Sequence, residues 1–493
     1  MRFTATDVFD YYKPSKCVRR VALRAREVPE QETDTSFMNL LRNLGLAHEA
    51  EHLASLAGVV SVAKGDPEDR ERRTLEAIRS GAAVVFQPRF RVGVSLGGEP
   101  CELVGEPDFL VRAPGGAGYF VRDSKLARNV LSSRHEGIQR QLQVYGLLFE
   151  RAVGKPPAGL EVHAGTGDIV RVAYDGDAAV LASLDEQRRM RAASPDLYEP
   201  VGWTKCKGCG YEARCASEAR AAEDVALLTT VNLERARELH ARGIGKIGQI
   251  AAAVDDPAHH DYFWTGKKKP VHKSFVAGLL RSAEAYLSKA DIPIAAPALP
   301  SASHFAMFDL EGLPPYIDDL EKVYLWGLKV FGQRPSGYLP AQAGMGADGD
   351  REGWFAFLGV AERLLAEYGS DLPFVHWSNH EKDKVRKYVE RYGDPAGVAA
   401  RVLENLVDLL SVTKASVVTP LPSYGLKTLE GHVGFRRRLT EANGAWSIAS
   451  YIEATECDDP VARERIVGQI LAYNEEDLDA TWAVLQWLQR LPA

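Results

Sequence analysis

The chain has 493 residues, which is more than one hydrophobic core usually organises, so two or three domains are expected. A hydrophobic content of 45%, a charged content of 26% and a formal net charge of −7 are those of an ordinary globular protein and exclude a globally basic surface for nucleic acid. The first residues form no apolar signal region, no apolar run reaches roughly 18 residues, and six cysteines are too few for a disulfide framework, so a cytoplasmic protein without a membrane span is expected.

Composition divides the chain into four parts. Residues 1–220 contain a strand pair, flanking helical stretches and a cysteine cluster, and residues 221–288 are predicted to be helical. Residues 289–303 are rich in proline and small residues and are predicted to be a linker, whereas residues 304–493 begin with a strand and end with a long helix. The 493 residues contain no G-x-x-x-x-G-K-[ST] phosphate-binding motif, so the sequence predicts no ATP-driven motor.

The stretch GEPDFLVRAPGGAGYFVRDSK predicts a β-hairpin, because alternating runs flank a Gly-Gly pair suited to a two-residue turn with positive φ. If paired residue numbers sum to 231, Leu110 faces Val121 and Asp108 faces Asp123. Lys125 points to the same face as Asp123. Facing carboxylates destabilise a hairpin unless a cation lies between them, so the pattern indicates a metal site.

The chemistry of this trio suits phosphodiester hydrolysis. Two aspartates offer hard oxygen ligands to Mg²⁺ or Mn²⁺, which activates water and neutralises charge on the phosphate. The ammonium group of Lys125 can stabilise developing negative charge or position the attacking water. The alternative is that D-x-K, a common pattern, marks solvated strand residues.

Two further elements accompany the hairpin. A histidine lies in an earlier helical stretch, and a glutamine and a tyrosine lie at i and i+4 on a later helical face. In order, the chain resembles the RecB family of PD-(D/E)xK nucleases at His48, Gly105-Glu106-Pro107-Asp108, Asp123-Ser124-Lys125, and Gln141 to Tyr145. The resemblance implies that the histidine and both aspartates bind metal, that the lysine is catalytic, and that the glutamine and tyrosine brace the site or substrate. A core histidine is the alternative for His48.

Three cysteines follow with the spacing C-x2-C-x5-C, which can place three thiolates around one centre: Cys206, Cys209 and Cys215. With Cys17 as a fourth ligand, the layout resembles the iron–sulfur branch of the same nuclease family, in which a [4Fe–4S] cluster joins the two ends of the domain. A four-cysteine zinc site and unliganded thiols are the alternatives. The other two cysteines are isolated and are predicted to be buried small hydrophobic residues: Cys101 and Cys457.

The middle part suggests two helices joined at Gly243-Ile244-Gly245. Such helical hairpins can present backbone N–H groups to a phosphate, and Lys246 with the lysines at 267, 268, 269 and 273 can add a basic surface. Two helices joined by a glycine turn are also a common structural connection without a ligand.

A second set of acids lies in residues 304–493. Asp309 and Glu311 share one face of a predicted strand, and D-x-E at the end of a buried strand can hold two metal ions. Asp477 lies on the inward-facing stripe of the closing helix, where a buried aspartate requires a metal or a hydrogen bond. Glu381 opens a helical pattern directly after a short predicted strand.

These features over residues 304–490 resemble the DEDD-type, RNase H-like 3′–5′ exonucleases. The resemblance implies that Asp309, Glu311, Glu381 and Asp477 bind metal and that Tyr473 orients the nucleophilic water. The third acid of that pattern is usually aspartate, so Glu381 is a departure, and Asp408 is an alternative ligand or a supporting residue.

Together these patterns predict an α/β multidomain protein: a PD-(D/E)xK restriction-endonuclease-like mixed sheet with helices and an iron–sulfur staple, a helical middle region, and an RNase H-like α/β domain. The combination resembles bacterial RecB-family nucleases, many of which also carry a helicase. A metal-dependent DNA nuclease, and specifically an exonuclease, is therefore expected in repair, recombination or defence, acting on single-stranded DNA or free ends with a separate helicase. A DNA-binding scaffold with an inactive RNase H-like domain and an RNA-processing nuclease are the alternatives.

Overall fold

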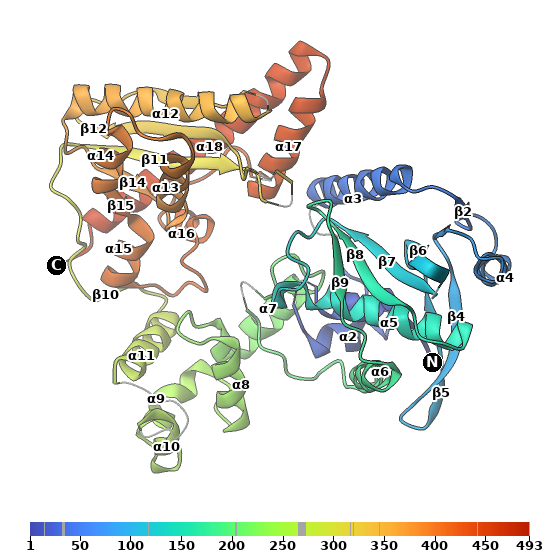
Figure 1. The fold of residues 1–493 in the computed structure, drawn as a ribbon. Coiled ribbons are helices and arrows are strands. Elements are labelled where there is room, and N and C mark those ends of the chain that lie inside the picture. The colour runs from blue at the N-terminus through green and yellow to red at the C-terminus, as the bar shows by residue number, and fades with distance from the viewer. Residues whose placement is uncertain are drawn as a thin grey trace. The chain divides into compact units, whose positions relative to one another are not determined.

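The computed structural model describes residues 1–13, 15–31, 35–116, 118–202, 205–264, 273–315, 317–318, 320–344, 346–440 and 442–492. The chain forms two compact units, which are described separately below. Unit 1 comprises residues 1–199 and 204–215, and unit 2 comprises residues 200–203 and 216–493 (Figure 1). Both contain helices and sheets, which confirms the predicted mixed α/β multidomain fold.

Unit 1 contains two sheets. The larger has the order β2-β3-β6-β7-β8-β9, with strands Val59–Ser61, Val84–Phe86, Phe109–Arg112, Tyr119–Lys125, Gly159–Ala164 and Ile169–Val172. The smaller has the order β1-β5-β4, with strands Arg2–Thr4, Glu99–Gly105 and Phe90–Leu96. The helices are α1 (Ala5–Tyr11), α2 (Val18–Arg24), α3 (Thr35–Ser55), α4 (Pro67–Arg79), α5 (Glu136–Val153), α6 (Asp177–Ala192) and α7 (Glu212–Ala222), the last of which continues into unit 2.

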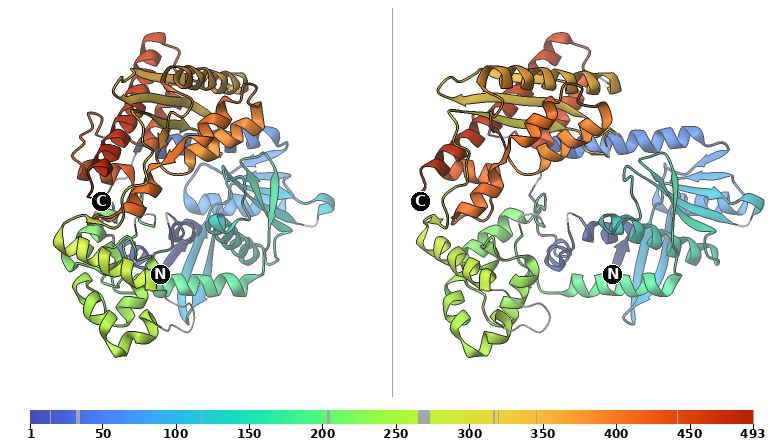
Figure 2. Two further views of the ribbon diagram at one scale, coloured as in Figure 1. Left: turned by 90° about the vertical axis from the view of Figure 1, so that its left-hand side faces the viewer. Right: turned by 60° about the vertical axis from the view of Figure 1, so that its left-hand side comes forward.

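Helix α5 connects β7 to the parallel strand β8, as parallel neighbours require a crossover. Its apolar residues Leu142, Tyr145 and Phe149 recur at helical spacing and belong to the same core as Val121 of β7 and Val162 of β8. Because strand side chains alternate, β7 and β8 turn every second residue toward α5 and the others away from it. Figure 2 shows α5 and this sheet from two further sides.

The hairpin of β6 and β7 has the predicted register. Leu110 pairs with Val121, and the ladder ends at Arg112 and Tyr119. Gly115 and Gly116 both have positive φ, 72° and 76°, as the turn residues were predicted to have. The connection is nevertheless longer than a two-residue turn, because the ladder ends at Arg112 and Tyr119. Beyond the ladder, the Ala113 N–H donates to the Gly118 carbonyl and the Gly116 N–H donates to the Ala113 carbonyl.

Unit 2 begins with helices α8 (Leu233–Ala241), α9 (Ile250–Asp255), α10 (His260–Phe263) and α11 (Lys273–Ser288). Between α8 and α9, Gly243 has a φ of 78° and allows the reversal predicted there. Lys246 forms an antiparallel bridge with Asp224. The basic run at 267–269 lies outside the described residues, and the predicted linker contains a short strand, β10 (Ile292–Pro293), which pairs with β16 (Val417–Val418).

The main sheet of unit 2 has the order β13-β12-β11-β14-β15, with strands Tyr338–Gln342, Val323–Gly332, His304–Gly312, Phe374–His376 and Leu406–Asp408. Strand β11 is antiparallel to β12 and parallel to β14. The helices are α12 (Gly346–Tyr368), α13 (His380–Tyr392), α14 (Val398–Glu404), α15 (Leu409–Ser416), α16 (Leu426–His432), α17 (Gly444–Glu456) and α18 (Pro460–Gln489).

The alternation of β11 separates two cores. Ala306, Phe308 and Leu310 pack with Trp354 and other residues of α12, whereas the odd-numbered residues Phe305 and Met307 pack with apolar residues of α18. Asp309 and Glu311 continue the odd-numbered series, so they lie on the α18 side of the sheet. In the described part of the chain, no helix combines the length and apolar character that crossing a membrane requires.

Candidate functional sites

The acids of the unit 1 hairpin meet as predicted. Asp123 is buried within β7, and Asp108 lies directly before β6. The Asp108 N–H donates to Asp123 Oδ1 over 3.3 Å, and the Ser124 N–H donates to Asp108 Oδ2 over 2.7 Å. Lys125 Nζ lies 2.6 Å from Asp123 Oδ2. The hairpin therefore brings two carboxylates and one ammonium group into contact.

Electrostatics at this pair favour an added cation. Burial, together with the charge of Asp123, raises the pKa of Asp108 well above its usual value. Burial alone would lower the pKa of Lys125, but the charges of Asp123 and Asp108 outweigh it and raise that pKa. When both carboxyl groups are ionised, one lysine does not balance their charge, so a metal with oxygen ligands can take the place of the proton on Asp108.

His48 lies on the other side of the sheet from Asp123. It stacks on His163 of β8 with ring centroids 4.1 Å apart, and His52, one turn further along α3, stacks on His163 at 4.0 Å. Val162 faces the α5 core, so His163 points the opposite way, and Ser124 Oγ contacts His163 Nδ1 at 3.3 Å. The structure therefore does not bring His48 together with the two aspartates.

Glu49, the residue after His48, is closer to the pair. Its negative charge raises the pKa of both Asp108 and Lys125, and its Oε1 accepts a hydrogen bond from Gln87 Nε2 at 3.1 Å. The sequence reasoning did not identify Glu49. The feature of the sequence that could have indicated Glu49 is its position directly after the predicted metal ligand His48.

Gln141 and Tyr145 lie together on α5, with Gln141 Nε2 donating to Tyr145 Oη at 3.2 Å. Burial and the charges of Asp123 and Asp108 raise the pKa of Tyr145, which places its ring beside the acids. Gly105, the last residue of β5, allows α5 to lie close to that strand. A Cβ at this position would lie 2.5 Å from Leu148 Cδ1 and 2.9 Å from Tyr145 Cε1.

The segment that carries Cys17 lies against the three-cysteine loop. Ser15 Oγ donates to the Lys205 carbonyl over 2.8 Å, and the Tyr211 hydroxyl donates to the Val28 carbonyl over 2.7 Å. Burial raises the pKa of the Cys17 thiol, and the nearby Cys209 adds to the rise. All four cysteines of the predicted set are half-buried.

The two isolated cysteines differ in their environment. Cys101 is buried in the core of unit 1, as predicted. The prediction for Cys457 is wrong: the residue is only half-buried, because it follows the end of α17, and its Sγ lies 3.5 Å from the Asp459 carbonyl.

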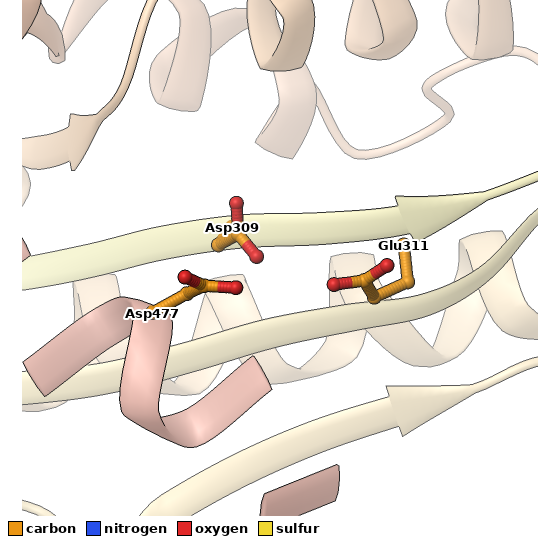
Figure 3. A group of neighbouring side chains, drawn as sticks. All are labelled: Asp309, Glu311 and Asp477. Atoms are coloured by element: carbon orange, nitrogen blue, oxygen red, sulfur yellow. The ribbon is translucent and has the colours of Figure 1, made fainter. Parts of the chain in front are cut away.

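In unit 2, Asp309 and Glu311 of β11 meet Asp477 of α18 (Figure 3). One ligand oxygen from each lies within 4.8 Å of the other two. Within the described ranges, this is the one set of three or more histidine, cysteine or acidic ligand atoms gathered so closely. The period of two along β11 places the first two acids on the α18 side, and the inward stripe of α18 supplies the third.

Burial and mutual repulsion raise the pKa of each of these acids. Burial and then the charges of Asp477 and Glu311 raise the pKa of Asp309 well above its usual value. Burial and the charge of Asp477 raise the pKa of Glu311 to about 8. The pKa of Asp477 is also raised by burial, although Arg437 opposes the rise. A divalent cation would favour the ionised form of each carboxyl group, and three clustered carboxylate oxygens are ligands that fit Mg²⁺ or Mn²⁺.

Asn474, one helical turn before Asp477, holds Asp309 in place. It is fully buried, its Nδ2 donates to Asp309 Oδ2 at 2.7 Å, and its Oδ1 accepts from the Tyr338 hydroxyl at 2.8 Å. The sequence reasoning missed this residue, although it lies on the same face of α18 as Asp477. Glu311 has partners of its own in Tyr324, at 3.4 Å, and the neighbouring Ser447.

Gly327→Ala is expected to disrupt this arrangement. A Cβ at Gly327 of β12 would lie 1.8 Å from Asn474 Oδ1, and the buried asparagine cannot shift without losing its hydrogen bonds to Asp309 and Tyr338. We expect a clear fall in the Tm of unit 2 in differential scanning calorimetry. Gly359→Ala in α12 is the control, since nothing lies within 4 Å of its Cβ and alanine should stabilise the helix by up to about 1 kcal/mol. An unchanged Tm for Gly327→Ala would contradict the packing described here.

Tyr473 is buried beside the three acids. Burial and the charges of Asp477, Glu311 and Asp309 raise its pKa. Its ring lies 5.3 Å from Lys427 Nζ and 5.7 Å from Arg437 Cζ. Neither cation was identified from the sequence, and both come from the segment between β16 and α17.

The fourth predicted acid stands apart from the other three. Glu381 opens α13 and is buried, but its Oε2 lies 3.1 Å from His376 Nδ1 at the end of β14. Its charge still contributes to the raised pKa of Asp309. Asp408 caps α15, where its Oδ1 accepts from the Ser411 N–H at 3.1 Å. The structure thus gathers three of the four predicted ligands.

Two protein-family models match separate parts of the chain. Residues 10–216 match the model of the PD-(D/E)XK nuclease superfamily, and residues 306–489 match that of the RNase H superfamily. The chain therefore contains one domain of each superfamily, which supports a nuclease, a phosphodiester hydrolase with nucleic acid as substrate.

A comparison with curated proteins found no match. Among solved structures, the chain is similar to "Crystal structure of SSO0001" at 16% identity, over 44% of this chain and 86% of that chain, with a TM-score of 0.24. A TM-score this low does not bear on the function of this chain.

Proposed function

We propose that the protein is a metal-dependent DNA exonuclease with two separate catalytic centres, acting in DNA repair, recombination or defence. The observation that carries the proposal is the set of three carboxylates on β11 and α18, whose ligand oxygens lie within 4.8 Å of one another. Buried like charges at such distances are unfavourable without a cation, so their retention points to metal binding.

In the unit 2 centre, Asp309, Glu311 and Asp477 would hold Mg²⁺ or Mn²⁺. When bound, the metal supplies a water of lowered pKa and neutralises charge on the phosphate. The protein's own contribution is orientation: Asn474 fixes one oxygen of Asp309, and Tyr473 lies close enough to the acids to position a water for attack on the strand end. Glu381 contributes charge from a greater distance.

In the unit 1 centre, Asp108 and Asp123 would hold the metal, and the Lys125 ammonium would stabilise charge that develops on the phosphate. Gln141 and Tyr145 brace the acid pair from α5. Glu49, rather than His48, is the α3 side chain whose charge reaches the pair, so we assign it the role of additional acid. His48 would instead stabilise the histidine stack on the other side of the sheet.

Cys17, Cys206, Cys209 and Cys215 would hold a [4Fe–4S] cluster. The contacts between the segment of residues 15–31 and the loop of residues 205–215 support this assignment, since they bring the ends of unit 1 together. Burial is the main cause of the raised pKa of the Cys17 thiol, and the smaller contribution from Cys209 agrees with a shared centre. The role assigned to the cluster is structural, joining two distant segments.

Loss of one cluster ligand is expected to remove the iron. Protein purified without oxygen should be brown and contain iron and sulfide, and Cys17→Ala should lose both as completely as Cys206→Ala. Because cluster binding contributes to folding, both variants should also have a lower Tm. Cys457→Ala is the control and should keep its iron, because that residue lies in unit 2 at the end of α17. Stoichiometric zinc in a colourless preparation would contradict the iron–sulfur assignment and favour a zinc site.

The overall proposal is tested by incubating the full chain with end-labelled single-stranded DNA, double-stranded DNA and RNA, with Mg²⁺, with Mn²⁺ and with a chelator. We expect metal-dependent shortening of DNA strands from their ends. Preferential cleavage of RNA would favour the RNA-processing alternative, and binding of DNA without cleavage would favour the scaffold alternative. Stimulation on double-stranded DNA by an added helicase would agree with a separate unwinding partner.

A further inference from the structure

Arg437, between α16 and α17, is held rigidly beside the unit 2 centre. Its Nε and Nη2 each donate to one carboxylate oxygen of Glu430 at 2.7 Å. Nη2 also lies 2.5 Å from Asp477 Oδ1. Only 6% of the arginine side-chain surface is exposed, and Glu430 is buried as well. This buried pair therefore fixes the orientation of the guanidinium group next to one of the three acids.

The remaining nitrogen of the same group, Nη1, is buried and has no hydrogen-bond partner among the described residues. In a planar guanidinium, one edge carries Nε and Nη2 and a second edge carries both Nη atoms. Glu430 occupies the first edge, so the contact with Asp477 comes from the second edge, which Nη1 shares. The unused donor therefore lies on the edge that faces the acids.

An arginine with a purely structural role would be expected to use this donor. Leaving a buried N–H unpaired sacrifices a hydrogen bond to water without replacement, which proteins generally avoid. The charge of Arg437 is already balanced by Glu430, so its position beside Asp477 is not needed to neutralise the arginine. An unpaired, preoriented guanidinium donor next to a centre of three carboxylates is suited to receive an anionic oxygen.

We propose that Arg437 binds a phosphate oxygen of the nucleic-acid end that enters the unit 2 centre, with Glu430 as its positioning residue. The inference rests on the proposed function of this centre and adds its phosphate-binding side chain. Lys427, whose Nζ lies 5.3 Å from the Tyr473 ring, stands near the same acids and supplies further positive charge. Guanidinium groups recognise phosphate through fixed N–H directions, so lysine should substitute poorly at position 437.

The test uses the full chain and thymidine 5′-monophosphate, a minimal strand-end analogue, titrated by calorimetry in the presence of Ca²⁺. Arg437→Gln/Glu430→Gln replaces the buried ion pair with a neutral pair and avoids leaving a lone buried charge. We expect its affinity for the nucleotide to fall at least tenfold, and Arg437→Lys to recover only part of the loss. Arg438→Gln is the matched control, since that side chain is 75% exposed and pairs with Glu476 instead.

Titration with Mn²⁺ alone separates this inference from the proposed function. Wild type and the double variant should both bind one class of Mn²⁺ that Asp309→Asn loses, and the Tm of each variant reports its folding. If Asp309→Asn loses no Mn²⁺, the proposed centre and the arginine inference both fail. If Mn²⁺ binding depends on Asp309 but the double variant binds the nucleotide as well as wild type, Arg437 is only an internal counterion and the inference alone is overturned.

Discussion

Asp309→Asn is expected to reduce cleavage at strand 3′ ends by orders of magnitude without lowering the Tm of the metal-free protein. Asparagine keeps an oxygen that can accept the hydrogen bond from Asn474 Nδ2, so the local packing should persist. It removes one of three clustered carboxyl groups, at a position where burial and then the charges of Asp477 and Glu311 raise the pKa of Asp309 well above its usual value. The substitution therefore relieves repulsion in the metal-free state while removing a ligand from the centre.

The measurement compares the rate of 3′-end shortening in a Lys125→Met background, so that unit 1 does not contribute. Asp479→Asn is the matched control, because Asp479 lies two residues from Asp477 on α18 but pairs with Lys329 and not with the three acids. It should retain full activity. Equal activity of Asp309→Asn and wild type, with equal Mn²⁺ binding, would show that the three acids are not the exonuclease centre.

Lys125→Met is expected to abolish cleavage by unit 1 while leaving its metal binding largely intact. Lys125 contacts Asp123 at 2.6 Å but is itself no metal ligand, so its removal takes away the group that would stabilise charge on the phosphate. Methionine preserves most of the side-chain length. Because Asp123 then loses its cationic partner, the metal-free variant should melt at a lower temperature and should gain more stability from Mn²⁺ than wild type does.

Cleavage is measured in an Asp309→Asn background, on the same labelled strands, together with Mn²⁺ affinity by calorimetry. Lys155→Met, at an exposed position after α5, controls for loss of one surface charge. Retention of wild-type cleavage by Lys125→Met would contradict the catalytic role of the lysine. Loss of Mn²⁺ binding along with cleavage would instead indicate that Lys125 acts by holding the acid pair together.

The hairpin shows how far local information reaches. Its register follows from the glycine pair and the alternation of the flanking residues, and the structure confirms that Leu110 pairs with Val121. The exact length of the turn does not follow from the sequence. The ladder ends at Arg112 and Tyr119, whereas an ideal two-residue turn at the glycine pair would continue it further. The ends of a ladder depend on what packs around them.

Periodicity and the resemblance to DEDD-type exonucleases together identified the acids of unit 2. A period of two places Asp309 and Glu311 on one side of β11, and the helical stripe of α18 turns Asp477 inward. The same reasoning cannot reveal Asn474, Arg437 or Glu49 as participants, because each acquires its role from a contact with a residue more than 35 positions away or on another element. It also cannot reveal that the Glu381 carboxylate turns to His376.

The sequence by itself determined the hairpin register and the positions of the candidate acids, because these depend on residue type and on the repeat of strands and helices. The two domain classes came instead from motifs that resemble known nuclease families, and the family models match them. Only the tertiary structure decided which side chains reach those acids. In the folded protein His48 of α3 lies on the side of the sheet opposite to Asp123, whereas the charge of the next residue, Glu49, reaches Asp108. Neighbouring residues of a helix differ in side-chain direction by about 100°, so one position along α3 is enough to make this difference. The tertiary structure also placed Arg437 against Asp477 across 40 residues, a proximity that only packing between separate elements can create.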